Sequence, residues 1–110
     1  IVGQRQISVT PTDTGESLYY RLEQTCVDLF RDMWPMIRSG YITRTPQSQQ
    51  TSTYHQTKDT NRVDAIDLDK NYLARDLINI LRARTFPPYD GAYFEEDGTR
   101  VYMRLELYES

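Results

Sequence analysis

Two arginines, Arg82 and Arg84, precede a run of aromatic residues near the C-terminal end of the sequence. Guanidinium groups form strong charge-assisted hydrogen bonds to phosphate, and aromatic rings stack on bases. Lys58, in a separate polar stretch, could add a third positive charge to a phosphate or pyrophosphate site. The rings that could stack a base are those of Phe86, Tyr89 and Tyr93. These residue types are suited to binding an anion beside a ring.

The same residues also have a purely structural interpretation. Either arginine could hydrogen-bond the last carbonyls of a helix and favour the negative end of its dipole, a contribution of about 0.3–1 kcal/mol. The rings could instead pack the Pro87-Pro88 corner against that helix. Because Arg82 and Arg84 point to different sides of the predicted helix end, we expect one of them to face a ligand or the loop. Trp34 is expected in the core.

The sequence contains no motif for catalysis. The single histidine, His55, has no serine elbow or paired cysteine beside it, and there is no histidine cluster to hold a catalytic metal. The five glycines are scattered at turns, so no phosphate-cradling loop is predicted. The single cysteine, Cys26, excludes an internal disulfide and a cysteine-based zinc site, and its apolar neighbours predict that it is buried. We therefore expect no catalytic residue and no metal site here.

Composition narrows the class of protein. At 110 residues with 38% hydrophobic and 26% charged residues, the chain has the size and composition of one folded domain. The formal net charge of −3 disfavours nucleic acid or an anionic membrane as a partner, because such binding depends on clustered Lys and Arg. No window approaches the length of a membrane span or matches a signal peptide. With one cysteine, a cytoplasmic location is expected.

The first part of the sequence predicts a strand followed by a long helix. Residues 1–9 alternate apolar and polar side chains, the period of a strand with one buried face. Asp13, with Glu16 three residues later, predicts a capping box at the start of a helix. Pro35 is expected to kink or break that helix, and Gly40 to end it in a left-handed conformation. The inward-facing stripe is predicted to consist of Leu18, Leu22, Leu29, Met33 and Ile37.

A long polar loop and a second helix follow. Residues 41–68 are rich in Gln, Thr and Ser and show no sustained period, so this loop is either functional or disordered. Asp67 or Asp69 is expected to cap the second helix, and the Pro87-Pro88 pair to stop it. The apolar positions of this helix are Leu73, Leu77, Ile80 and Leu81.

The C-terminal segment predicts a β-hairpin. Asp97-Gly98 is a strong hairpin-turn signal between predicted strands at residues 92–96 and 99–108. The face of the second strand predicted to be buried carries Val101, Met103, Leu105 and Leu107. The predicted fold class is therefore an α+β arrangement of strand, long helix, long loop, second helix and C-terminal hairpin.

The order of the motifs resembles a known family across almost the whole chain. The motifs are Ile1-Val2-Gly3-Gln4, Asp13-Thr14-Gly15-Glu16-Ser17-Leu18-Tyr19, Pro46-Gln47, Lys58-Asp59, Arg82-Ala83-Arg84-Thr85-Phe86-Pro87-Pro88-Tyr89 and Gly91-Ala92-Tyr93-Phe94. In this order they resemble the C-terminal half of formyltransferases that use N10-formyltetrahydrofolate. The resemblance is greatest to the sugar-nucleotide N-formyltransferases, which act on dTDP-linked amino sugars.

The resemblance implies a fragment of an α/β formyltransferase fold with three parts. Residues 1–40 would end the catalytic domain, residues 41–68 would form the polar loop, and residues 69–110 would form a helix and hairpin subdomain. The catalytic Asn, His and Asp of the family would lie upstream of Ile1, so we expect this chain alone to be inactive. N10-formyltetrahydrofolate would be bound mainly by the upstream half.

The resemblance also implies the partners. The expected ligand is a nucleotide-linked amino sugar, and the expected assembly is a homodimer through the C-terminal hairpin. The residues expected to bind the nucleotide-sugar, by position, are Gln47, Tyr54, Lys58, Arg84, Phe86 and Tyr93.

Two other functions are considered. The chain could be a non-catalytic dimerisation or interaction module built from a helix pair and a hairpin. It could also belong to a protein like methionyl-tRNA formyltransferase, a branch that appends a basic barrel to hold tRNA. The acidic end at Tyr108-Glu109-Ser110 argues against that branch.

Overall fold

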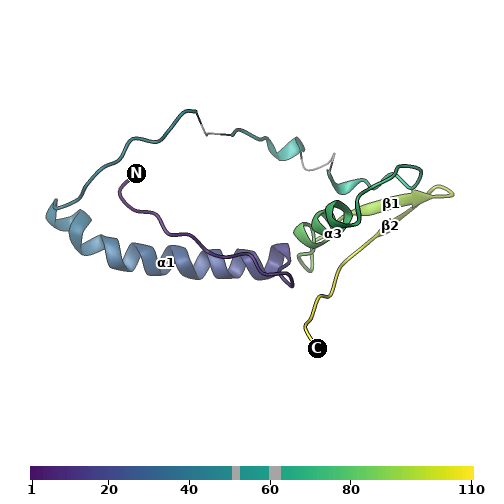
Figure 1. The fold of residues 1–110 in the computed structure, drawn as a ribbon, viewed down its shortest axis with the longest axis horizontal. Coiled ribbons are helices and arrows are strands. Elements are labelled where there is room, and N and C mark those ends of the chain that lie inside the picture. The colour runs from purple at the N-terminus through teal and green to yellow at the C-terminus, as the bar shows by residue number, and fades with distance from the viewer. Residues whose placement is uncertain (51–52, 60–62) are drawn as a thin grey trace.

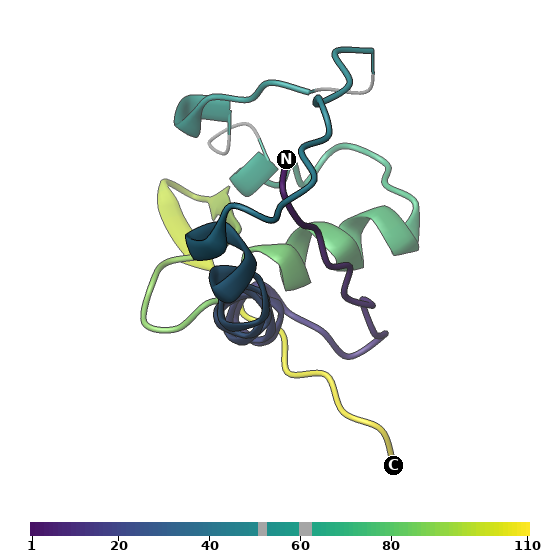
Figure 2. The ribbon, with the colours of Figure 1, turned by 90° about the vertical axis from the view of Figure 1, so that its left-hand side faces the viewer.

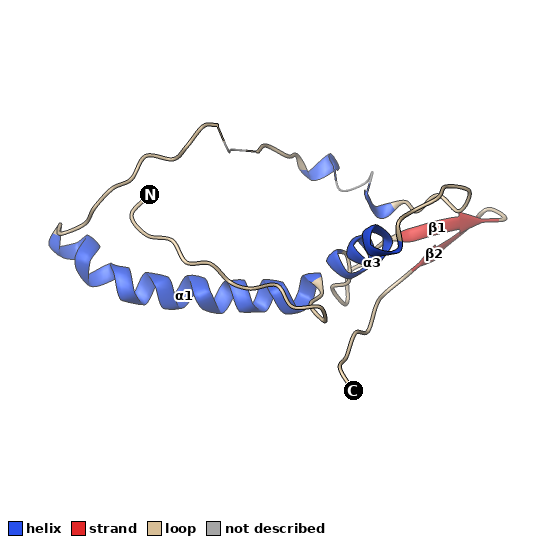
Figure 3. Cartoon of the chain, viewed as in Figure 1, coloured by secondary structure: helices blue, strands red, loops and turns tan. Residues whose placement is uncertain are grey.

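The computed structural model describes residues 1–50, 53–59 and 63–110, so five residues of the predicted polar loop lie outside the described residues. The elements in chain order are helix α1 (Gly15–Ser39), the short 3-10 helix η1 (Thr57–Asp59), helix α3 (Ala74–Ala83) and strands β1 (Tyr93–Glu96) and β2 (Thr99–Tyr102). Figures 1 and 3 show this order of long helix, loop, shorter helix and hairpin. The two predicted helices and the hairpin are confirmed.

The strand predicted at residues 1–9 is wrong. This segment runs beside α1 without forming a strand (Figure 1). Arg5 pairs with Asp32 at 2.6 Å, and Arg21 donates to the Ser8 carbonyl at 2.6 Å. A strand requires a ladder of backbone bonds to a neighbour, and such bonds join this segment to the described loop only where Ile1 pairs with Thr45.

The start of α1 differs in detail from the prediction. The N-cap is Thr14, whose hydroxyl accepts from the Ser17 amide at 3.3 Å, while the Ser17 hydroxyl accepts from the Thr14 amide at 2.9 Å. This capping box replaces the predicted box of Asp13 and Glu16. The predicted break at Pro35 is also absent, since the helix continues to Ser39.

The end of α1 follows the prediction. Gly40 caps the helix with φ of 83°, the left-handed conformation in which glycine has no side chain to clash. Its amide donates to the Ile37 carbonyl at 3.2 Å.

Burial in this chain is much lower than its apolar pattern predicted. Neither described α-helix contains a buried residue, and Leu22 of the predicted inward stripe is 44% exposed. Cys26 is exposed and Trp34 is 44% exposed, so both predictions of burial are wrong for this chain. Among the described residues the only buried hydrophobic side chain is that of Ala92. An apolar helical stripe shows which face needs cover but not which segment covers it.

Helix α3 begins later than predicted. Leu73 is its N-cap and makes no side-chain capping bond. The predicted caps lie in the preceding turn, where the Asp67 carboxylate accepts from the Asp69 amide at 3.0 Å. The helix ends at Ala83, ahead of the Pro-Pro corner as predicted.

The hairpin is antiparallel with a two-residue turn. Asp97 and Gly98 have φ of 51° and 76°, and positive φ at both positions is the mark of a type I′ turn. The ladder ends at Tyr102, so the predicted second strand is shortened to four residues. Met103 continues with one bond from its amide to the Ala92 carbonyl at 2.8 Å. Beyond the ladder the side chains still alternate. Met103, Leu105 and Leu107 are half-buried, and the residues between them are exposed.

The two helices meet at a tight junction. A Cβ on Gly15 would lie 2.4 Å from the Ala83 carbonyl oxygen, so only glycine permits this approach. The Glu16 amide donates to the Thr85 carbonyl at 3.1 Å. Figure 2, seen close to the α1 axis, shows α3 running crosswise to α1. This junction holds the end of α3 and the Pro-Pro corner against the first turns of α1.

The molecule is extended. Its radius of gyration is 18.7 Å, where a compact chain of this length has about 13 Å. Its accessible surface is 9444 Å², against about 6,300 Å² for a compact protein of the same mass.

Candidate functional site

A cavity of about 460 Å³ lies where the first turns of α1 meet the end of α3. Its lining residues are Gly15, Tyr19, Ala83, Arg84, Phe86, Tyr89 and Asp90. Gly15 and Ala83, whose backbones approach closely, both line it. The cavity combines a guanidinium, a carboxylate and aromatic rings, which suits a polar ligand that carries a planar ring.

Phe86 lies at the centre of an aromatic cluster of four rings. The cluster consists of Tyr19, Tyr20, Phe86 and Tyr89, with centroids 5.3, 5.9 and 5.7 Å from that of Phe86 in this order. The edge-to-face and tilted arrangements match the preferred geometry of aromatic pairs. The three tyrosines are 52%, 57% and 68% exposed. They therefore offer open ring surface beside the cavity.

Arg84 holds the end of the polar loop beside this cavity. Its Nε donates to Asp64 Oδ1 at 2.5 Å and its Nη2 donates to Oδ2 at 3.2 Å. Asp64 is 14% exposed, so the pair is partly shielded from water. The carboxylate neutralises much of the positive charge that a phosphate would meet at Arg84.

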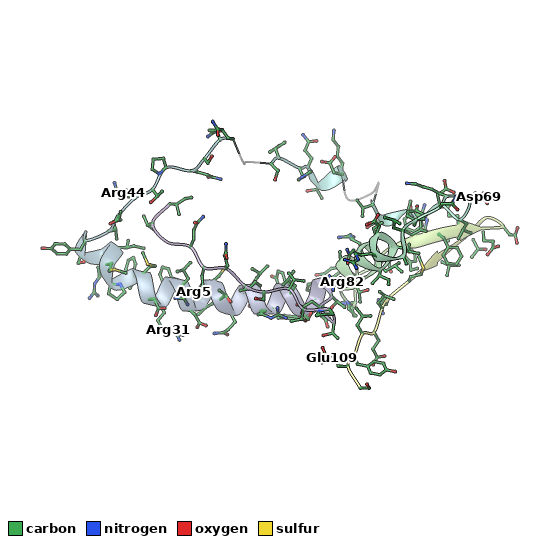
Figure 4. The ribbon with its side chains drawn as sticks, in the orientation of Figure 1. Arg5, Arg31, Arg44, Asp69, Arg82 and Glu109 are labelled. Atoms are coloured by element: carbon green, nitrogen blue, oxygen red, sulfur yellow. The ribbon has the colours of Figure 1, made fainter. Side chains whose placement is uncertain are left out.

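Arg82 points elsewhere. Its Nη1 donates to the carbonyls of Thr10 and Pro11, both at 3.1 Å, and Figure 4 shows it at the junction of the two helices. The expectation that one of the two arginines faces the loop is therefore met by Arg84. Arg82 instead fixes the turn that leads into α1.

Tyr93 lies apart from the aromatic cluster, on the hairpin. The Arg100 guanidinium carbon lies 4.2 Å from its ring centroid, and the Tyr102 ring is 5.6 Å away. Tyr93 lines a second cavity of about 860 Å³, whose other lining residues are Ala65, Ile66, Asp67, Leu68, Asp69, Phe94, Glu95, Glu96 and Asp97. Its five carboxylates disfavour a phosphate ligand there.

The other predicted binding residues lie on the polar loop. Gln47, Tyr54 and Lys58 are all exposed, with Tyr54 at 83%. The loop arches away from α1 in Figure 1. Among the six predicted residues, the structure brings Arg84 and Phe86 to one cavity, and leaves Tyr93 and the three loop residues outside its lining.

The sequence interpretation missed the contributions of Tyr19, Tyr20 and Asp64. The two tyrosines come from α1 and meet Phe86 across more than sixty residues of sequence. Both tyrosines lie off the predicted inward stripe, and Tyr19 ends the helix-start motif that begins at Asp13.

The described residues contain neither a metal-binding cluster nor a membrane-spanning helix. No three His, Cys, Asp or Glu side chains there are grouped so as to hold a metal ion. Neither α1 nor α3 has the length and apolarity that crossing a bilayer demands.

Comparison with known proteins gives related sequences and structures. The family "N-formyltransferase dimerization C-terminal domain" matches residues 59–109. A curated dTDP-4-amino-4,6-dideoxyglucose formyltransferase of Mycobacterium bovis is 27% identical over 109 residues, which cover 97% of this chain and 46% of the relative.

The solved structures that superpose on this chain are also N-formyltransferases. A 4-N formyltransferase from Francisella tularensis superposes with a TM-score of 0.91 at 32% identity, covering 99% of this chain and 45% of that chain. A sugar N-formyltransferase from a Shewanella species superposes with a TM-score of 0.87 at 26% identity, covering 99% of this chain and 44% of that chain. This chain therefore spans about half the length of the relatives it matches.

Proposed function

Because the chain is homologous to the C-terminal region of sugar N-formyltransferases, we propose that it is the corresponding part of such an enzyme. The reaction is transfer of a formyl group from N10-formyltetrahydrofolate to the amine of a dTDP-amino-dideoxy sugar. The observation that carries the proposal is the superposition on the Francisella tularensis enzyme, which extends over 99% of this chain. At 32% identity with a TM-score of 0.91, the likeness extends to the sequence as well as to the general fold.

The role of this region is to hold the nucleotide-sugar. The thymine ring stacks on the open rings of the aromatic cluster, since base stacking on aromatic side chains tolerates different partners and contributes about 1–3 kcal/mol per base. The diphosphate is bound by Arg84, which it shares with the Asp64 carboxylate, and by the exposed Lys58. Gln47, Tyr54 and Tyr93 complete the proposed binding set, through closure of the loop and the hairpin over the ligand.

The chemical step depends on the rest of the enzyme. The amine attacks the formyl carbon, so the site needs a base for the amine proton and donors for the oxyanion. The family resemblance assigns these tasks to an Asn, a His and an Asp upstream of Ile1, together with most of the folate contacts. The residues described here bind and orient the sugar nucleotide, and this region alone is inactive.

The hairpin subdomain makes the enzyme a homodimer. The match to the dimerisation family at residues 59–109 contains α3, β1 and β2. Strand β2 is an edge strand, with Val101 and Tyr102 39% and 44% exposed. An exposed apolar edge favours pairing with another chain.

Binding of dTDP to the dimeric enzyme tests the proposed site. Phe86→Ala removes the central ring of the aromatic cluster, and we expect dTDP to bind at least about tenfold more weakly. Tyr108→Ala, which removes an 81% exposed ring near the C-terminal end, is the matched control and leaves the Kd unchanged. Equal Kd values for Phe86→Ala and the unsubstituted protein would remove the cluster from the site.

A second function is supported by the low burial of the chain. A non-catalytic interaction module would use the exposed apolar surface to dimerise without any ligand. Analytical ultracentrifugation of the 110-residue chain, combined with a measurement of dTDP binding, distinguishes the two. A soluble monomer would rule out the module, whereas a dimer that binds no dTDP would favour it.

A further inference from the structure

We propose that the segment at residues 103–105 positions the aromatic cluster for the nucleotide-sugar, and that it does so through Thr85 and Arg104. The inference rests on the proposed function, because the cluster is the part of the site that stacks the thymine ring. Neither Thr85 nor Arg104 is a lining residue of the candidate cavity. Both are therefore positioning residues that act through the rings and do not touch the ligand.

The rings of the cluster come from two kinds of backbone. Tyr19 and Tyr20 belong to α1, whose own hydrogen bonds fix the backbone at both residues. Phe86 and Tyr89 belong to the corner at residues 85–89, which follows α3 and lies outside any helix or strand. Contacts from other segments are therefore needed to hold these two rings in place.

Thr85 fixes the start of the corner. It is 5% exposed, and its hydroxyl donates to the Leu81 carbonyl at 2.7 Å and accepts from the Leu105 amide at 3.0 Å. Its own carbonyl accepts from the Glu16 amide at 3.1 Å. Thr85 is thus bonded to α3, to the segment after β2 and to the start of α1. Because Phe86 is the next residue, these bonds fix the backbone that carries the central ring.

Arg104 holds the other end of the corner. Its Nη2 donates to the Pro88 carbonyl at 3.3 Å and to the Tyr89 carbonyl at 3.4 Å. The positive charge of the donor strengthens these long bonds. The Tyr89 amide in turn donates to the Phe86 carbonyl at 2.9 Å. Arg104 therefore restrains the turn that carries the Tyr89 ring.

The segment that makes these two contacts is packed closely against the chain around the corner. The Met103 amide donates to the Ala92 carbonyl at 2.8 Å. A Cβ on Gly91 would lie 2.7 Å from the Arg84 carbonyl oxygen and 3.0 Å from the Met103 carbonyl oxygen. Gly91 and Ala92 are both buried. The backbones therefore approach one another with no room for a side chain, which gives Thr85 and Arg104 a fixed base.

This arrangement predicts an effect on ligand affinity. A ligand that has to order the rings on binding loses affinity, whereas a site with its rings already in place does not. The chemical step belongs to another part of the proposed enzyme, so a looser corner raises KM and Kd and leaves kcat nearly unchanged. A purely structural role would do the opposite, because a smaller folded fraction lowers kcat at constant KM and Kd.

The test uses a chimera in which this chain replaces the matching region of the Francisella tularensis enzyme. Thr85→Val keeps the shape of the side chain and removes the hydroxyl, whereas Thr85→Ser keeps the hydroxyl. We expect Thr85→Val to raise the Kd for dTDP and the KM for the dTDP-amino sugar at least about fivefold. Thr85→Ser should leave both close to those of the unsubstituted chimera. Equal effects of the two substitutions would remove the hydroxyl from the positioning role.

Arg104→Met is a second variant, at an exposed position where the fold does not depend on the side chain. We expect a similar rise in Kd, of which Arg104→Lys, with its positive donor, should recover a part. The matched controls are Thr99→Val and Arg75→Met, which make the same changes at exposed positions of β2 and α3. Both should leave the Kd unchanged.

Hydrogen exchange separates this inference from the proposed function, because it needs no ligand. We expect the Tyr89 amide to exchange faster after Arg104→Met, since the turn that protects it is released. Faster exchange in a chimera that binds no dTDP would contradict the proposed function and keep the restraint on the corner. Unchanged Kd values for Thr85→Val and Arg104→Met, in a chimera that does bind dTDP, would overturn the inference and keep the proposed function.

Discussion

At the scale of single residues, two buried polar side chains connect the segments around the site. Asp13 and Thr85 are each 5% exposed. The Asp13 carboxylate accepts from the Arg21 guanidinium, from the Thr10 amide at 2.7 Å and from the Ser17 hydroxyl at 2.8 Å. These donors, the Arg21 guanidinium first, hold the pKa of Asp13 well below its ordinary value.

The low pKa of Asp13 makes stability depend on pH. A depressed pKa in the folded state gives stabilisation that is complete above the unfolded-state pKa of about 3.9 and is lost as the pH falls toward the folded-state pKa. We expect Asp13→Asn to lower the free energy of unfolding at pH 7 and to flatten its decline below about pH 4. Urea unfolding across this range measures both effects. Asp97→Asn, in the exposed hairpin turn, is the control, and an equal profile for the two variants would contradict the role of Asp13.

Thr85 links α3 to the C-terminal segment. Its hydroxyl donates to the Leu81 carbonyl at 2.7 Å and accepts from the Leu105 amide at 3.0 Å. Thr85→Val keeps the shape but leaves the Leu105 amide without its acceptor, a cost of about 1–3 kcal/mol in the free energy of unfolding. Thr99→Val, at an exposed strand position, should have little effect. No difference between the two variants would show that water replaces the Thr85 hydroxyl.

The residue types near the site were predictable from the sequence, but their pairing was not. The sequence placed Arg84 and Phe86 in one motif, and the structure brings both to one cavity. Nothing in the sequence matched Arg84 with Asp64, because an ion pair between residues twenty positions apart leaves no periodic signal. The caps were misassigned for a similar reason, since Asp13, Thr14 and Ser17 are all competent capping residues within one short stretch.

At the scale of elements, the junction of α1 and α3 determines the shape of the candidate site. The approach at Gly15 places the Tyr19 and Tyr20 rings of α1 beside the Pro-Pro corner. The period of each helix was readable from the sequence, whereas this contact depends on a single glycine. The strand expected at residues 1–9 failed because alternation predicts a strand only where a neighbouring strand is present.

The junction predicts that adding a methyl group at Gly15 lowers the free energy of unfolding more than adding one at Gly3. Gly15→Ala would place Cβ 2.4 Å from a backbone oxygen that cannot move alone, and we expect a loss of about 1–3 kcal/mol in the free energy of unfolding. Gly3→Ala meets only the flexible Met33 side chain, at 3.1 Å, and should be much less disruptive. Thermal unfolding of both variants measures the difference. Similar midpoints for the two would refute the tight junction.

The hairpin predicts how the dimer responds to a charge. Val101→Asp places a carboxylate on the exposed β2 edge, and we expect it to convert the dimer to a monomer. Sedimentation velocity measures the mass of the particle. Tyr54→Asp, on the polar loop outside the dimerisation match, serves as the control and should stay dimeric. A Val101→Asp variant that remains a dimer would place the interface away from this edge.

At the scale of the whole molecule, the chain has an open shape. An extended chain of 62 × 37 × 24 Å with a single buried hydrophobic side chain among its described residues cannot draw much stability from its own core. The proposed function explains this shape, because one exposed surface would meet the other half of the enzyme and another would meet the second subunit. The sequence predicted one folded domain, because composition does not reveal whether apolar faces are covered within the chain or by a partner.

The most direct test of the proposed function is an assay of formyl transfer from N10-formyltetrahydrofolate to dTDP-4-amino-4,6-dideoxyglucose. Mass spectrometry of the sugar nucleotide detects the product. The assay compares the 110-residue chain with the folded, dimeric chimera that adds the rest of the Francisella tularensis enzyme. We predict that the chimera adds one formyl group to the amine and that the chain alone adds none. Formylation by the chain alone, or none by the folded chimera, would contradict the proposal.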